Sequence, residues 1–217
     1  MRVHNCGVRT YRRSGIPIGA LVALLVATTS ARRAADPPPP APIVENARVR
    51  VWDVAPGGAA APALPGRDAV TFIIRGTPPN VETEVRYRAK GTVVPGPPQD
   101  ARRIVIELQD ANVAPHTNTS GYPLAFPRPG SRKLFENERV VVWSFTWTRG
   151  VATPMHFHDK DVVVTYLADG ALTSTDPQGK STVNEHHFGY TKFNARDRVH
   201  TELLARGQGS ALMVELK

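Results

Sequence analysis

Three histidines give the sequence its clearest chemical signal. His156 and His158 stand two residues apart in the stretch GVATPMHFHDKDVVVTYLADG, and His200 follows in RVHTEL. In a β-strand, side chains two positions apart share a face about 6–7 Å apart, and a neighbouring strand lies about 4.8 Å to the side. A position for His200 on such a neighbour would complete a facial trio of imidazoles.

Three neutral imidazoles form a ligand set for a divalent transition metal. Imidazole suits Zn, Cu, Fe and Ni, and three such ligands leave open coordination positions for water, substrate or dioxygen. We predict one metal ion held by His156, His158 and His200; the ligand types do not distinguish Fe, Zn, Ni, Mn and Cu. The alternative is a vestigial site in which the imidazoles only form hydrogen bonds.

A carboxylate could join this set. Glu202 follows His200 by two residues and shares its strand face, so it is the candidate for a fourth ligand or for a partner of a ligating imidazole. Asp161 is three residues from His158 and would face away in a regular strand, so we expect it at a turn or strand edge. His186 and His187 are adjacent and must point to opposite faces, so at most one of them could add a ligand.

These side chains must be positioned by β-strands. Short runs rich in Val, Ile, Thr and aromatic residues alternate with turns rich in Gly, Pro and Asp, as in VVVWSF, DVVVTYL, STVNEHHF and ALMVEL. Outside the N-terminal apolar run, no stretch has a helical period over three turns. We predict an all-β antiparallel sandwich or barrel, because closing the sheet hides its edges.

The chain also repeats itself. VENARVRVW at Val44–Trp52 matches FENERVVVW at Phe135–Trp143, and both copies end on a similar strand, IVIEL and LMVEL. Between these points Pro62, Asp68 and Gly76 align with Pro154, Asp161 and Gly170. Agreement in separate places indicates a duplication. The predicted boundaries are 44–108 for the first copy, 109–134 for a proline-containing linker, and 135–217 for the second copy.

The N-terminus has the pattern of an export signal. A basic start ends at Arg12-Arg13, an apolar run spans Ile16–Ala27, and the small residues Thr29 and Ala31 predict cleavage after Ala31. We therefore predict a signal peptide over 1–31, a stiff proline-rich linker over 32–43, and a periplasmic or secreted mature chain. An uncleaved anchor is the alternative, but the run is shorter than the roughly 20 apolar residues that span a bilayer. A twin-arginine route stays open.

Charge and cysteine content narrow the function classes. The net charge is +8, but four arginines precede the apolar run, so the mature chain would keep 27 − 4 = 23 basic against 19 acidic residues. No basic stripe is interleaved with aromatic residues, so we expect no nucleic-acid partner and, after signal cleavage, no membrane partner. The sole cysteine, Cys6, precedes the apolar run, so the mature fold would depend on its core without disulfides.

The second copy resembles the cupins. Their first motif is G, five residues, H-x-H, three or four residues, E, six residues, G; it maps onto Gly150, His156, His158 and Gly170, with Val163 in place of the glutamate. Their second motif maps onto Gly189, Ala195-Arg196-Asp197, His200 and Leu204, where its proline, second glycine and asparagine are replaced. The sequence thus has all three histidines of the cupin motifs but not their glutamate.

The resemblance implies a jelly-roll β-barrel over 135–217 and a fainter, degenerate copy over 44–108, so the whole is similar to a bicupin. Ala63, Leu64 and Pro65 stand where the first copy would have its H-x-H, so we expect no metal there. Cupins often pair, so the resemblance also implies that a homodimer could form.

Two functional classes follow from the resemblance. Cupins that lack the glutamate include three-histidine iron dioxygenases acting on thiols or diketones, which implies a small-molecule dioxygenase-like enzyme. The alternative is a non-catalytic ligand-binding or structural cupin with a vestigial or purely structural metal site. Both classes imply a small-molecule ligand or a shaped pocket, and neither assigns a catalytic residue. Metal uptake outside the cytosol would favour Cu or Zn.

Overall fold

The structure is a computed structural model that describes residues 41–58, 66–91, 99–109, 113 and 116–217. The predicted signal peptide, most of the proline-rich linker and the Ala63–Pro65 segment lie outside these residues. The chain divides into Met1–Asp36, which is likewise outside them, and one compact unit, Pro37–Lys217. The described residues form an all-β fold, as predicted, and include no helix that could cross a membrane.

Fourteen strands are assigned within the described residues. They are β1 (Val44–Glu45), β2 (Val49–Val54), β3 (Ala69–Thr77), β4 (Asn80–Arg88), β5 (Arg102–Leu108), β6 (Ser131–Glu136), β7 (Val140–Trp147), β8 (His156–His158), β9 (Asp161–Tyr166), β10 (Gly170–Thr175), β11 (Ser181–His186), β12 (Thr191–Asn194), β13 (Arg198–Gly207) and β14 (Gly209–Leu216). Every strand pair between them is antiparallel.

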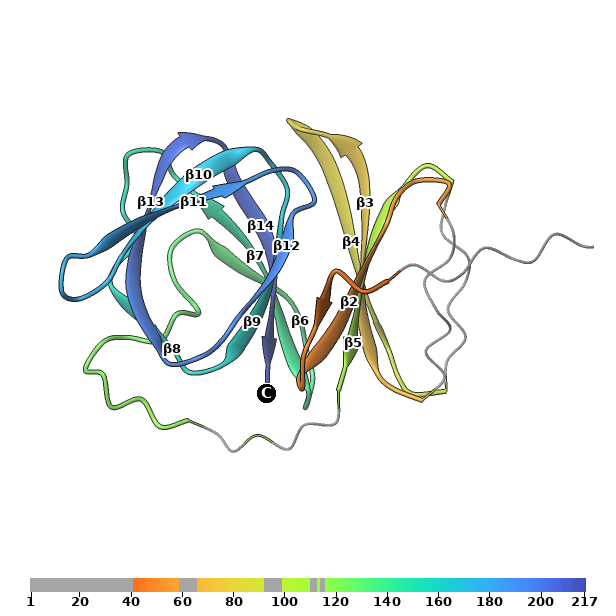
Figure 1. Cartoon of the computed structure of the whole chain (residues 1–217), viewed down its shortest axis with the longest axis horizontal. Helices are drawn as coiled ribbons and strands as arrows, with labels where there is room; N and C mark the ends of the chain where they lie inside the picture. Colours follow the sequence, from red (N-terminus) through yellow and green to blue (C-terminus); the bar gives the residue numbers. More distant parts are fainter. Residues whose placement is uncertain (1–40, 59–65, 92–98, 110–112, 114–115) are drawn as a thin grey trace, which may run out of the picture. The chain divides into compact units, whose positions relative to one another are not determined.

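Strands β6 to β14 form a jelly-roll barrel from two sheets. One sheet has the order β11-β10-β13-β8 and the other β12-β9-β14-β7-β6 (Figure 1). Alternate residues of β7 serve two cores: Trp143, Phe145 and Trp147 pack inside the barrel, whereas Val140 and Val142 join a second cluster on the opposite face of the sheet. This period of two is what the alternation of side chains in a strand requires.

The first half of the chain contributes a single sheet with the order β1-β2-β5-β3-β4. Its strands follow the same order as β6-β7-β14-β9-β12, in which each strand has one counterpart. Strands β3 and β4 are joined directly by a tight turn with Thr77 opposite Asn80, whereas β9 and β12 are separated by β10 and β11. Among the described residues, the first half has no counterpart of the strands that carry the histidines.

The repeated sequence forms the same corner twice. The Asn46 side-chain oxygen accepts the backbone N–H groups two and three residues later, at 2.8 and 3.0 Å. Asn137 makes the same two bonds at 2.9 and 3.0 Å. Side chains of this kind close an Asx-turn, which explains why the Asn-x-Arg pattern recurs before β2 and β7.

Part of the predicted linker lies inside the barrel. Ala125 donates its N–H to the carbonyl of Phe157 and Phe157 donates to that of Pro123, each at 2.8 Å, so this segment pairs with β8. Ala125 and Phe126 are buried in the barrel core, and β6 already begins at Ser131. Apolar residues of the predicted linker 109–134 thus cover the otherwise free edge of β8.

Candidate metal centre

Strands β8 and β13 bring the three histidines together. His156 and His158 share one face of β8, and β13 pairs beside it with His200 opposite His156. The ring centroids are 5.0 Å apart for His156 and His158, 4.7 Å for His156 and His200, and 5.1 Å for His158 and His200. All three side chains are buried. The juxtaposition predicted from strand alternation is present.

The nitrogen atoms fit a metal ligand set. The Nε2 atoms of His158 and His200 lie 3.3 Å apart, and one ligand nitrogen from each of the three histidines lies within 4.8 Å of the others. Two tetrahedral ligands with Zn–N distances of about 2.0–2.1 Å are separated by about 3.3 Å, which the closest pair matches. His158 Nδ1 is buried without a hydrogen-bond partner in the described part of the chain. The cluster could therefore bind a metal.

The three imidazoles are neutral at ordinary pH. Burial and, secondarily, Arg128 lower the pKa of His156 to about 3. Burial lowers the pKa of His200 to about 4. Burial, followed by the nearby Arg198, holds the pKa of His158 well below its ordinary value. Neutral imidazoles keep a lone pair for a metal, as ligation requires.

Arg128 also reaches this centre, and sequence reasoning did not identify it. His156 Nδ1 donates to the Pro154 carbonyl at 2.8 Å, which leaves its Nε2 lone pair to accept a hydrogen bond from Arg128 Nη1. The guanidinium lies over the rings of Phe126 and Phe145, with its central carbon 5.0 and 4.4 Å from the centroids. A metal ligated by His156 Nε2 would have to displace this contact.

Glu202 lies on the same strand face as His200, as predicted. Its Oε2 accepts from Arg128 Nη2 and from Trp147 Nε1, each at 3.0 Å, and its Oε1 lies 3.8 Å from His200 Nε2. Burial alone would raise the pKa of this carboxyl, but the positive charge of Arg128, the neighbouring histidines and the hydrogen bond from Trp147 together lower it. Glu202 is thus an ionised partner of Arg128 beside the cluster.

The position of the missing glutamate needs a correction. Val163 does not face the histidines. It packs with residues such as Val70 and Phe72 in the apolar cluster between the two large sheets, which are the five-stranded sheet of the first half and the five-stranded sheet of the barrel. Val162 faces the barrel interior and lines the same cavity as His158. The resembled motif allows three or four residues before its glutamate, and the register of β9 selects the shorter spacing. The site lacks a carboxylate there in either register.

The turn before β13 explains one departure from the cupin pattern. Asp197 stands where the second motif has a glycine, and it adopts a left-handed φ of 65°. Aspartate tolerates this conformation better than most residues that carry a Cβ. Its N–H donates to the His158 carbonyl at 2.8 Å. Asp161 begins β9, as expected of a strand-edge residue, and accepts the Arg196 N–H at 2.9 Å.

The two remaining histidine candidates stay outside the cluster. His186 is the inward residue of the pair: its ring stacks on Tyr166 with centroids 4.2 Å apart, and its Nε2 donates to the Gln208 carbonyl at 3.1 Å. His187 is exposed. Gly170 explains the tight packing here, because a Cβ would lie 2.6 Å from the Gln208 carbonyl oxygen and 2.8 Å from His186 Nε2.

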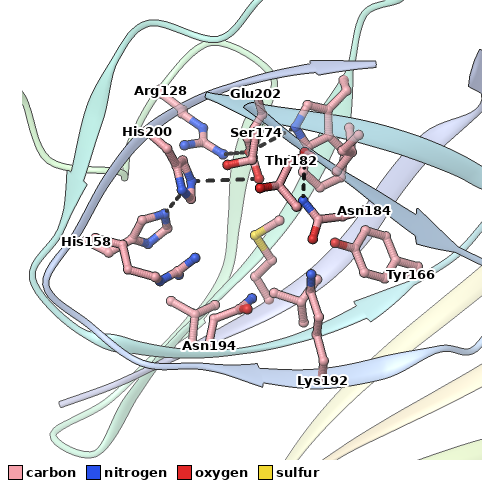
Figure 2. Close-up of a pocket in the computed structure, with 16 residues that line it drawn as sticks. Arg128, His158, Tyr166, Ser174, Thr182, Asn184, Lys192, Asn194, His200 and Glu202 are labelled. Carbon is pink, nitrogen blue, oxygen red and sulfur yellow. Dashed lines mark hydrogen bonds and ion pairs between the residues drawn. The ribbon is translucent and has the colours of Figure 1, made fainter. Parts of the chain in front are cut away.

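A cavity of about 280 Å³ adjoins the histidines inside the barrel. His158, His200 and Glu202 line one end, and alternate residues of the strands line the rest (Figure 2). The apolar wall is formed mainly by Val162, Val164, Leu172 and Met213. The polar lining includes Ser174, Thr182, Asn184, Lys192, Asn194 and Arg198. Such a mixture is typical of a small-molecule site.

No protein-family model matches the sequence, and no curated protein matches it. Solved structures similar to this chain include a cupin domain from Bordetella pertussis, 26% identical, covering 42% of this chain and 97% of that one with a TM-score of 0.37. A cupin 2 conserved barrel domain protein from Leptotrichia buccalis is 14% identical, with coverages of 81% and 87% and a TM-score of 0.45. A polyketide cyclase from Streptomyces resistomycificus is 22% identical, with coverages of 48% and 79% and a TM-score of 0.33.

The identification depends on three features of this chain itself. Its sequence keeps the histidine positions of both cupin motifs, its strands close an antiparallel jelly-roll barrel, and the histidines meet inside that barrel. The chain has a cupin fold with a three-histidine cluster.

Proposed function

We propose that the protein is an exported cupin with one mononuclear metal site that acts on, or binds, a small molecule in the adjoining cavity. His156, His158 and His200 would hold the metal. The observation that carries this proposal is the burial of three neutral imidazoles with ligand nitrogens within 4.8 Å of one another, next to a cavity of about 280 Å³. When bound, a divalent transition metal supplies Lewis acidity, and iron or copper also supplies redox chemistry.

The residues around the cluster have separate roles in this proposal. The Pro154 carbonyl fixes the His156 tautomer by accepting from Nδ1. Trp147 and Arg128 hold Glu202 in place by donating to Oε2. Glu202 is either a fourth ligand or an ionised group that balances the charge near His200. The apolar wall excludes water from the ligand, which strengthens the polar contacts made inside the barrel.

If the protein is an enzyme, we propose a dioxygenase-like reaction on a small molecule, and thiols and diketones are the substrate classes to test. The alternative is a non-catalytic cupin whose site is vestigial or structural. One observation favours this alternative: Arg128 donates to His156 Nε2 and Nδ1 donates to the Pro154 carbonyl, so both ring nitrogens of His156 have hydrogen-bond partners without a metal. Both functional classes stay in the proposal, because metal ligation by His156 requires only that the Arg128 guanidinium move away from Nε2.

Metal content tests the site. The purified protein should contain about one metal ion per chain by elemental analysis, and His156→Ala and His158→Ala should each lose most of it. His187→Ala is the matched control because His187 is exposed and lies outside the cluster. Equal metal content in all four proteins would exclude the site.

Dioxygen uptake separates the two functional classes. If the wild type contains iron, uptake with a panel of small thiols and diketones that is lost in His156→Ala supports the enzyme. A metal-loaded protein that binds panel members without consuming dioxygen is a binding cupin. Absence of metal from a folded wild type supports the vestigial site.

Export, duplication and assembly belong to the same proposal. The signal pattern over 1–31 supports a periplasmic or secreted location, and cleavage after Ala31 can be checked by N-terminal sequencing of the purified protein. The shared strand order of the two halves supports a bicupin whose N-terminal half is degenerate. A homodimer is the proposed assembly, which light scattering would measure.

A further inference from the structure

Two cations line the cavity without a direct ion pair to an acidic side chain in the described part of the chain. Lys192 projects from β12 and Arg198 from β13, and both are half-buried. Arg198 Nε donates to the Ala195 carbonyl at 2.6 Å, and Lys192 Nζ lies 5.7 Å from the Tyr166 ring centroid. Neither forms an ion pair with an Asp or Glu among the described residues. Removing a cation from water without such a partner is costly, so these two positions favour a bound anion.

The rest of the site does not neutralise these charges. Glu202 is the acidic residue of the lining, and it is already paired with Arg128 at 3.0 Å. The imidazoles are neutral. The cavity therefore keeps two positive charges from Lys192 and Arg198, which lie beside a histidine cluster that would itself become positive on binding a metal.

The shape of the lining indicates an organic anion. Figure 2 shows Lys192 and Asn194 on one wall and Ser174, Thr182 and Asn184 on the opposite wall, with the histidines at one end. The serine, threonine and asparagine side chains are uncharged and can donate hydrogen bonds to carboxylate oxygens. The Arg198 guanidinium can offer two donors to one carboxylate. The valines, Leu172 and Met213 offer apolar contact to a carbon skeleton.

We infer that the ligand of this cavity is a small organic carboxylate whose charged group is held by Lys192 and Arg198 next to the three histidines. The inference rests on the proposed function in that it assigns the ligand class of the same cavity. It assigns a substrate class for the enzyme and a ligand class for the binding protein.

Isothermal titration tests the inference on the metal-free protein. Benzoate and succinate are the anionic probes, and benzamide and succinamide are uncharged probes of matching shape. The carboxylates should bind, and each amide should bind at least about tenfold more weakly because charge-assisted hydrogen bonds are lost. Lys192→Met and Arg198→Met should each weaken carboxylate binding about 10- to 100-fold, whereas Lys192→Arg should retain most of it.

Arg132→Met is the control variant, since it removes an exposed positive charge from β6 outside the lining and should bind as the wild type does. Amides that bind as tightly as the acids, or an unchanged affinity in folded Lys192→Met and Arg198→Met, would overturn the inference. If either variant does not fold, the acid-against-amide comparison on the wild type decides. Carboxylate binding by a protein that takes up no metal when Zn²⁺ is added would overturn the metal site alone, and metal binding without carboxylate binding would overturn this inference alone.

Discussion

Val162 and Val163 are neighbours in β9 with opposite surroundings, and this difference can be tested. Val162 lines the cavity with His158, whereas Val163 lies in the apolar cluster between sheets. We expect Val162→Glu to add a carboxylate ligand and to tighten metal retention about tenfold or more. Val163→Glu should instead bury an unpaired charge and lower the free energy of unfolding by about 3–5 kcal/mol.

Chelator competition measures the first effect and chemical denaturation the second. The two substitutions are chemically identical, so each is the control for the other. Tighter metal binding in Val163→Glu, or an equal loss of stability in both variants, would show that the assigned register of β9 is wrong.

Arg128 and Glu202 should affect metal affinity in opposite directions. Arg128 places a positive charge against His156 Nε2, so Arg128→Met should tighten metal binding. Glu202 supplies a negative charge 3.8 Å from His200 Nε2, so Glu202→Gln should weaken it. Changes of about tenfold or more are expected for charges at this distance. Isothermal titration with Zn²⁺ would measure both.

In the metal-free protein both variants should be less stable, because each leaves the other buried charge without its partner. Denaturation in the presence of a chelator measures that loss. An affinity change of the same sign in the two variants would contradict the electrostatic role given to this pair.

At the scale of elements, the pairing of β8 with β13 makes stability depend on pH. The folded protein holds the pKa of His156 at about 3 and that of His200 at about 4, whereas an unfolded chain protonates histidine near pH 6.5. The unfolded state therefore binds more protons between pH 6.5 and 4, so the free energy of unfolding falls as the pH falls through this window. The expected loss is about 2–3 kcal/mol for each imidazole between pH 6.5 and 4.5.

Denaturation curves at several pH values, with a chelator present, would measure this dependence. His156→Gln should have a shallower pH dependence than the wild type because one titrating group is removed. His187→Gln should leave it unchanged, since His187 is exposed. An identical dependence in the wild type and His156→Gln would show that His156 is not buried in its neutral form.

Local sequence patterns predicted the elements and part of the site. Strand alternation was enough to place His156 and His158 on one face, and Glu202 beside His200, because these relations involve residues two apart. The spacing of the first motif could not choose between Val162 and Val163, because it accepts loops of two lengths. Arg128 could not be predicted, since its contact with His156 depends on a proline-containing segment folding back along β8, and no local pattern encodes that pairing.

At the scale of the whole compact unit, the two halves contact each other through equivalent residues. Alternate residues of both large sheets form one apolar cluster, in which the counterparts are Val49 and Val140, Val51 and Val142, Val70 and Val163, and Ile106 and Val214. In a two-fold interface, a residue pair recurs with the partners exchanged. The cluster therefore supports the proposed duplication in addition to the sequence repeat, because counterpart positions of both halves pack in it.

Two ion pairs between the halves are also equivalent, with the arginine and the aspartate exchanged between the halves. Arg48 in the first half contacts Asp161 in the second at 3.0 Å, and Arg139 in the second half contacts Asp68 in the first at 3.0 Å. Of the two ion pairs, only the one between Arg48 and Asp161 is connected to the histidine cluster. Asp161 also accepts the Arg196 N–H, and the next residue, Asp197, donates to the His158 carbonyl.

We therefore expect Arg48→Met and Arg139→Met to differ in one respect. Each should lower the free energy of unfolding by about 1–3 kcal/mol, because each removes the cationic partner of a partly buried carboxylate and a hydrogen bond to a backbone carbonyl oxygen. Only Arg48→Met should also weaken metal retention, since Asp161 helps hold the turn that fixes the end of β8. Denaturation and chelator competition on both variants measure the two effects. Equal metal retention at equal loss of stability would mean that the interface between the halves supports the fold without positioning the site.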